Sequence, residues 1–123
     1  MRSLGLHQIT AMEAGPVGLV GIAAETGCSH VCIFTQLPKG ITGFPVITQD
    51  NKRAFMDAVR DSGVGVANVE FFPVMPDTDL EEYRAGLALG AEIGGTRAVT
   101  HVHDTDNARA ADTLRRLCDM AAR

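Results

Sequence analysis

The sequence lacks several features that particular classes of protein require. It contains no tryptophan, one tyrosine and three cysteines among 123 residues. Cys28, Cys32 and Cys118 form an odd number without paired C-x-x-C spacing, which disfavours a disulfide framework. We therefore expect three reduced, buried thiols that have no chemical role.

Long apolar runs and clustered positive charges are also missing. No segment approaches the ~20 apolar residues that span a bilayer, and residues 1–5 lack the apolar core of a secretory signal. We therefore expect a cytoplasmic protein without a membrane partner. The net charge of −4, with 11 scattered Lys and Arg residues against 15 Asp and Glu residues, argues against a nucleic-acid partner. Phosphate contacts need clustered positive side chains.

What the sequence does contain is a repeat. Three times a helical pattern ends at a glycine and a β-rich run follows: AAETG-CSHVCIF at Gly27, VRDSG-VGVANVEFF at Gly63, and AEIGG-TRAVTHV at Gly94 and Gly95. Glycine favours the left-handed conformation just past a helix end. The spacing of about 30 to 36 residues is the length of a βαβ step. With 46% hydrophobic residues, the chain is predicted to form one globular domain over residues 1–123.

The pattern predicts four strands, each followed by a helix. The strands are expected at residues 4–9, 30–35, 65–71 and 97–103. The helix starts carry their own signals: Pro16 in a first turn, Thr48 as a cap, Thr78 and Glu81 as a capping box, and Thr105 or Asp106 as the last cap.

Strict alternation of strands and helices indicates a parallel sheet. An open doubly wound sheet and a barrel both satisfy this pattern, but no glycine-rich phosphate-binding motif follows the first predicted strand. We therefore predict an α/β fold consisting of a parallel (βα)4 half of a TIM (β/α)8 barrel.

Three segments resemble one known family. LALGAEIGG at residues 87–95 is similar to a helix end, AAETGCSHVCIF to the entry into the second strand, and residues 104–123 to the segment after the fourth strand. The family is that of sugar phosphate isomerases/epimerases with xylose isomerase-like TIM barrels. The resemblance implies proton transfer on a sugar or polyol substrate, assisted by a divalent metal such as Mn, Zn, Co or Mg.

Members of this family are more than twice as long as this chain, and most of their metal ligands lie in the second half. The chain is therefore expected to be a fragment of a longer barrel or a genuine half-barrel. A half-barrel leaves one sheet face uncovered and two edges unpaired, so an isolated chain is expected to form a homodimer or higher oligomer.

Polar residues at the carboxyl ends of the predicted strands are the candidate site, because barrel enzymes carry their chemistry there. Glu70 lies in an otherwise apolar strand and is the candidate catalytic acid or base, with a salt bridge as the alternative. His101 and His103 have the H-x-H spacing of two metal ligands, with binding of substrate alone as the alternative. The candidate substrate-binding residues are His7, Gln36, Asn68, His103 and Asp104.

Two long connections are candidate walls of the site, at residues 36–47 and 72–77. Lys39 in the first could meet a phosphate or remain solvated, and Phe71, Phe72 and Met75 near the second could stack on a ligand or pack internally.

Three functions fit these observations. The first is a metal-assisted sugar or sugar phosphate isomerase or epimerase, and the second is a non-catalytic half-barrel that binds small molecules or assembles with a partner. An endonuclease like those of the endonuclease IV branch is disfavoured by the acidic charge.

Overall fold

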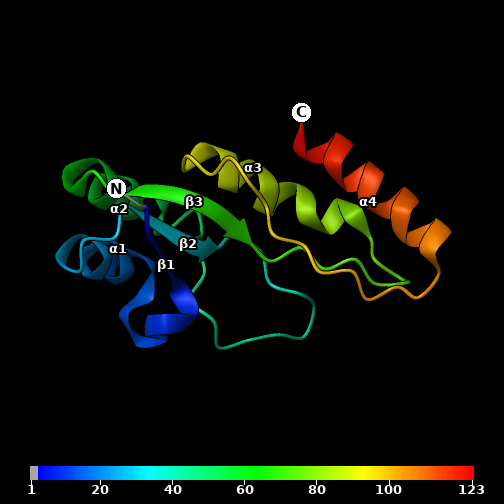
Figure 1. The fold of residues 1–123 in the computed structure, drawn as a ribbon, viewed down its shortest axis with the longest axis horizontal. Helices are drawn as coiled ribbons and strands as arrows, with labels where there is room; N and C mark the ends of the chain where they lie inside the picture. Colours follow the sequence, from blue (N-terminus) through cyan, green and yellow to red (C-terminus); the bar gives the residue numbers. More distant parts are fainter. Residues whose placement is uncertain (1–2) are drawn as a thin grey trace.

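A parallel β-sheet lies at the centre of the structure (Figure 1). The computed structural model describes residues 3–123; Met1 and Arg2, the first residues of the N-terminal stretch, lie outside the described part. The strands β1 (Gly5–His7), β2 (His30–Phe34) and β3 (Gly65–Glu70) pair in parallel in the order β1–β2–β3. The first three predicted strands are therefore confirmed.

The fourth predicted strand does not form a regular strand. Its residues lie beside β3 and the segment that follows β3. They pair with this neighbour only through isolated parallel bridges, at Ala98 and Val102. The cause lies at the end of β3, where the N–H of Phe71 donates to the carbonyl of Gln36 on the opposite side. The next bond to the fourth segment comes from Phe72 instead, so the ladder shifts by one residue and loses its regularity.

Helices connect the strands and end where the glycines predict. Gly27, Gly63 and Gly94 adopt positive φ angles of 76°, 74° and 93°, which confirms them as helix stops. Within residues 3–123, no helix combines the length and the apolar character that crossing a membrane requires. The helical elements are η1 (Gln8–Ala14), α1 (Gly15–Glu25), α2 (Lys52–Ser62), η2 (Leu80–Tyr83), α3 (Arg84–Glu92) and α4 (Asn107–Ala121).

Two of the predicted helix starts are confirmed. Pro16 lies in the first turn of α1, where its missing N–H costs nothing. Asp106 caps α4, and its side chain accepts a hydrogen bond of 3.0 Å from the N–H of Arg109.

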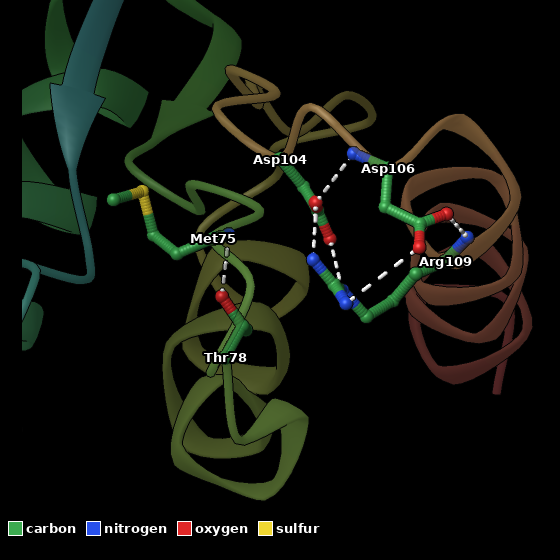
Figure 2. Close-up of polar contacts among 5 residues, drawn as sticks. All are labelled: Met75, Thr78, Asp104, Asp106 and Arg109. Atoms are coloured by element: carbon green, nitrogen blue, oxygen red, sulfur yellow. Dashed lines mark hydrogen bonds and ion pairs between the residues drawn. The ribbon is translucent and has the colours of Figure 1, made fainter.

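The other two predicted starts are wrong. The short helix η2, which leads into α3, is capped by Asp79 rather than Thr78. The hydroxyl of Thr78 is used elsewhere, because it accepts a 2.7 Å hydrogen bond from the N–H of Met75 (Figure 2). Thr48 precedes a turn, and α2 begins four residues later at Lys52.

One face of the sheet forms the hydrophobic core with the helices. Along β2, Val31 and Ile33 are fully buried, whereas His30 and Cys32 are only half-buried. This alternation is expected for a sheet with one covered face. Helices α1 and α2 lie side by side (Figure 1). The covering helices α1, α2 and α3 contribute Leu19, Phe55 and Leu89 to this core.

Two glycines allow α3 and the following turn to approach β3 closely. A Cβ atom added to Gly90 would lie 2.7 Å from Cγ2 of Val69, and one added to Gly95 would lie 2.9 Å from Cγ1 of the same side chain. Atoms do not approach that closely, so the Val69 side chain or the backbone would have to shift. The glycines of the LALGAEIGG segment therefore have a packing role.

The cysteines are unpaired, but not all are buried as expected. Cys28 and Cys32 are half-buried, and Cys118 is exposed. The reason is that α4 fully buries only Ala110 and Leu117, and Cys118 lies outside the side of the helix that packs against the core.

Candidate functional site

The face of the sheet opposite the helices carries polar side chains and Phe34, arranged in two rows. His7, Cys32 and Asn68 lie opposite one another across β1, β2 and β3, and Phe34 lies opposite Glu70 in the next row. Residues that pair across parallel strands share one face of the sheet. The candidate residues from the first and third strands are therefore brought together.

An irregularity in β3 makes this arrangement possible. Val31 pairs with Val66, but Cys32 pairs with Asn68, so Ala67 is skipped. With regular pairing, Asn68 would lie opposite the buried Ile33 and point toward the helices, because side chains alternate. The extra residue turns the end of β3 over and places the Glu70 carboxylate on the same face as His7.

The carboxylate of Glu70 is held in place by two neighbours. Its Oε1 atom lies 2.7 Å from Nε2 of His7 and accepts a 3.0 Å hydrogen bond from Nδ2 of Asn68. Glu70 is only 8% exposed. Among residues 3–123 no side-chain hydrogen bond reaches Oε2, so one oxygen is fixed and the other is available to a ligand.

The hydrogen bonds of His7 define its tautomer. The N–H of Ile9 donates to Nδ1 of His7 at 3.1 Å, so Nδ1 is an acceptor and carries no proton. A neutral imidazole then carries its proton on Nε2, which donates to Glu70. His7 therefore orients a charged carboxylate without needing to be charged itself.

Cys32 lies within reach of this charge. Burial raises the pKa of its thiol, and the negative charge of Glu70 raises it further. A thiol with a raised pKa is a poor nucleophile at neutral pH, so we assign Cys32 no reactive role.

An apolar cavity of about 280 Å³ is lined in part by Glu70. The aromatic rings of Phe34 and Phe44 meet edge to face, with centroids 5.3 Å apart, and Phe71 makes a similar contact of 4.9 Å with His101. All lining residues other than Glu70 and His101 are apolar. The remaining ones are Ile9, Leu37, Pro38 and Ile41.

A second, larger cavity of about 600 Å³ continues from the first and shares Pro38, Ile41 and Phe71 with it. It lies between the connection after β2 and the connection after β3, the two segments predicted to wall the site. Its lining is much more polar. The ionisable lining residues are Lys39, Asp77, Asp79, Glu82, Tyr83 and His103.

The three residues predicted to stack on a ligand or to pack internally behave differently. Phe71 is half-buried and lines both cavities. Phe72 is fully buried and packs against Tyr83, with ring centroids 5.5 Å apart. Met75 is 40% exposed and lines the larger cavity.

His101 and His103 share one side of the fourth segment, as H-x-H spacing predicts. Their rings are nearly parallel, with centroids 6.2 Å apart and an interplanar angle of 11°. Metal sites built from protein side chains need three or more ligands, and no group of three His, Cys, Asp or Glu residues within 3–123 could hold an ion. Glu70 is already bound to His7 and Asn68. The described residues therefore do not fit a complete metal site.

Gln36 and Asp104 are not part of the Glu70 cluster. The side chain of Gln36 donates to the carbonyl of Leu37 and packs over Gly86 of α3, where an added Cβ would lie 2.8 Å from the Cβ of Gln36. Asp104 is buried and forms a bidentate ion pair with Arg109, with N–O distances of 2.6 and 2.7 Å (Figure 2). The hydrogen bond from Arg109 holds the pKa of Asp104 below its usual range.

His30 lies at the opposite end of the sheet and has a packing role. Its Nδ1 atom lies within hydrogen-bond distance of the hydroxyls of Ser29 and Ser3, at 2.8 and 3.1 Å. Its ring covers Gly65, where an added Cβ would lie 3.0 Å from the imidazole.

Sequence reasoning missed the residues that shape the apolar cavity. Phe34 is one of several apolar residues in its strand, so the sequence does not distinguish it from core residues. Phe44 lies in a loop whose path depends on a bridge between Val46 and β2. The one available signal was the length of the connection after β2. This length predicted that the connection borders the site, but it did not identify the side chains that line the cavity.

Comparison with solved structures finds a protein of similar fold. The structure resembles the crystal structure of a sugar phosphate isomerase/epimerase from Parabacteroides distasonis ATCC 8503, with a TM-score of 0.63 and 17% sequence identity. The likeness covers 99% of this chain and 51% of that protein, so the chain spans about half its length. At this identity the likeness is one of fold. No family model matches the chain, and no curated protein matches it.

Proposed function

We propose that the chain contributes to proton transfer in a sugar or sugar phosphate isomerase or epimerase, with Glu70 as the acid/base group. The observation that carries the proposal is a carboxylate only 8% exposed, held by His7 and Asn68, beside a cavity. Buried, oriented carboxylates are suited to general acid/base catalysis. The name of the structurally similar protein supports the same reaction class.

The proposed step uses the free oxygen of Glu70. The carboxylate takes a proton from the carbon next to a substrate carbonyl, the C–H electron pair moves into the C–C bond, and the carbonyl oxygen gains negative charge. Glu70 is then a neutral acid. In a substrate with a hydroxyl group on the deprotonated carbon, that hydroxyl proton moves to the former carbonyl oxygen, and return of the first proton to the former carbonyl carbon gives the isomer. Return of a proton to the opposite face of the original carbon, from a second donor, gives an epimer.

We further propose that the chain is a (βα)4 half-barrel completed by a second copy. The edge of β1 and the edge formed by residues 97–103 have no neighbouring strand within the described chain, and unpaired edges favour pairing with another chain. The chain covers 51% of the structurally similar protein, which supports the proposal that it is one half of a larger fold. Light scattering is expected to give the mass of a dimer, whereas a monodisperse monomer would contradict the proposed assembly.

The metal predicted from the resemblance would need ligands from outside residues 3–123. Elemental analysis of the same chromatographic peak tests this. Stoichiometric Mn, Zn or Co that is reduced by substitution of His101 and His103 with alanine would support the two histidines as ligands, and a metal-free peak that retains activity would contradict this prediction.

The proposed activity is tested by solvent exchange. The protein is incubated with fructose 6-phosphate in D2O, with and without Mn²⁺, and deuterium next to the carbonyl is measured by NMR. Exchange that is lost in Glu70→Gln and retained in Glu25→Gln, which changes an exposed carboxylate on α1, is the expected result. Binding without exchange would instead support a non-catalytic binding module.

A further inference from the structure

The cavity beside Glu70 is unlike a site for a free polyol. Apart from Glu70 and His101, every residue that lines it is apolar, so few of a sugar's hydroxyl groups could find a hydrogen-bond partner inside. A buried hydroxyl without a partner weakens binding by roughly tenfold or more. The number of hydroxyl groups therefore limits what this cavity can bind.

The shape and size of the cavity favour a single ring. Its volume of about 280 Å³ is at the lower end of small-molecule sites. Phe34, Phe44 and Phe71 come from different segments and supply ring faces and edges. Aromatic walls bind the C–H faces and π-systems of flat or ring-shaped ligands.

The polar groups are placed where a carbonyl compound needs them. The carboxylate of Glu70 and the imidazole of His101 both line the cavity. His101 can donate a hydrogen bond to a carbonyl oxygen, and Glu70 can accept a proton from the adjacent carbon. A purely apolar patch for a protein partner would not need a buried carboxylate held by two hydrogen bonds.

We propose that the cavity binds a small ring ketone with few hydroxyl groups, its ring against Phe34, Phe44 and Phe71 and its carbonyl between Glu70 and His101. This inference rests on the proposed role of Glu70 and narrows the substrate class to cyclic ketones, derived from sugars or polyols, that retain few hydroxyl groups. Any strongly polar substituent, such as a phosphate, would extend into the larger cavity, which contains Lys39 and His103.

Two ketones of similar size test the proposal. Cyclohexanone has no hydroxyl groups, whereas dihydroxyacetone has two, and the binding of each to the full chain can be measured by ligand-observed NMR. We expect cyclohexanone to bind at least tenfold more tightly. Phe44→Ala should weaken its binding about fivefold or more, and Met56→Ala, which changes an exposed residue of α2 outside the cavity, should leave it unchanged. Tighter binding of dihydroxyacetone, or unchanged binding to Phe44→Ala, would overturn the proposal.

The same titration separates this inference from the proposed activity. If cyclohexanone binds as expected but no carbonyl compound exchanges with D2O, the proposed activity fails and the assignment of the cavity stands. If exchange occurs on fructose 6-phosphate but cyclohexanone does not bind, the assignment of the cavity fails alone.

Discussion

The imidazole Nε2 of His7 and the carboxylate Oε1 of Glu70 lie 2.7 Å apart, although the two residues are separated by 63 positions in the chain. His7 ends β1 and Glu70 ends β3, with β2 between them. The contact depends on the skipped residue in β3 and on a backbone N–H that leaves Nε2 as the donor. Strand pairing and local chain geometry thus combine to orient one carboxylate.

The tautomer of His7 gives the first prediction. ¹⁵N NMR of the imidazole at pH 8 is expected to show the proton on Nε2, because Nδ1 accepts from Ile9. His7→Ala should lower the exchange rate about tenfold, since Glu70 loses a charge-assisted hydrogen bond. His7→Gln should recover part of the rate, because its amide can donate. A proton on Nδ1, or equal rates for both variants, would contradict the assigned geometry.

The rate at which the Cys32 thiol is chemically modified is expected to depend on the charge of Glu70. Its thiol pKa is raised first by burial and then by that charge, so iodoacetamide at pH 8 should modify the exposed Cys118 well before Cys32. Glu70→Gln removes the negative charge and should speed modification of Cys32 severalfold, as measured by peptide mass spectrometry. Glu25→Gln is the control. No acceleration in Glu70→Gln would mean that Glu70 is uncharged or points away from Cys32.

The ion pair of Asp104 and Arg109 predicts that part of the free energy of unfolding is lost at acidic pH. The pKa of Asp104 is lowered in the folded protein, so its stabilising effect is complete above the usual carboxyl pKa of about 4 and is lost as the pH falls through the lower folded value. Urea unfolding from pH 6 to pH 2 should show a smaller loss of stability for Asp104→Asn than for the unsubstituted chain. Asp50→Asn, at an exposed turn position before α2, should behave like the unsubstituted chain.

Two glycine substitutions should have opposite effects on stability. Gly90→Ala places a methyl group 2.7 Å from Val69 and should lower the free energy of unfolding by about 1–3 kcal/mol. Gly21→Ala, in α1 with nothing within 4 Å of the new atom, should raise it by about 0.5–1 kcal/mol. Chemical denaturation measures both. Equal effects would show that the close packing of α3 on β3 is absent.

The sequence predicts the positions of the helices and strands better than it predicts the register in which the strands pair. Alternating apolar residues identified three strands, and the glycines at 27, 63 and 94 marked the helix ends, because these signals are local. The shift at Ala67 that turns Glu70 toward His7 has no local signal, since either face of β3 could have been the covered one. The fourth strand lost its regularity through a long-range bond between Phe71 and Gln36, which no periodicity reveals.

The residues of the candidate site were likewise predicted where the signal is local and missed where it depends on long-range contacts. Glu70, His7 and Asn68 were identified because polar residues at strand ends are unusual in an apolar context. Asp104 was identified by the same rule, but a residue five positions later, Arg109, occupies its carboxylate. The aromatic walls depend on the path of a loop and could be located only in three dimensions.

The central claim is that the carboxylate of Glu70, in the position set by His7 and Asn68, transfers protons. The most direct test compares the unsubstituted chain with Glu70→Asp and Glu70→Gln in D2O, using incorporation of deuterium next to the carbonyl of the substrate. Glu70→Asp keeps the charge but withdraws the carboxylate by one methylene, so we expect its exchange rate to fall about 10- to 100-fold. Glu70→Gln should fall to the background rate. Exchange by Glu70→Gln at the rate of the unsubstituted chain would contradict the account.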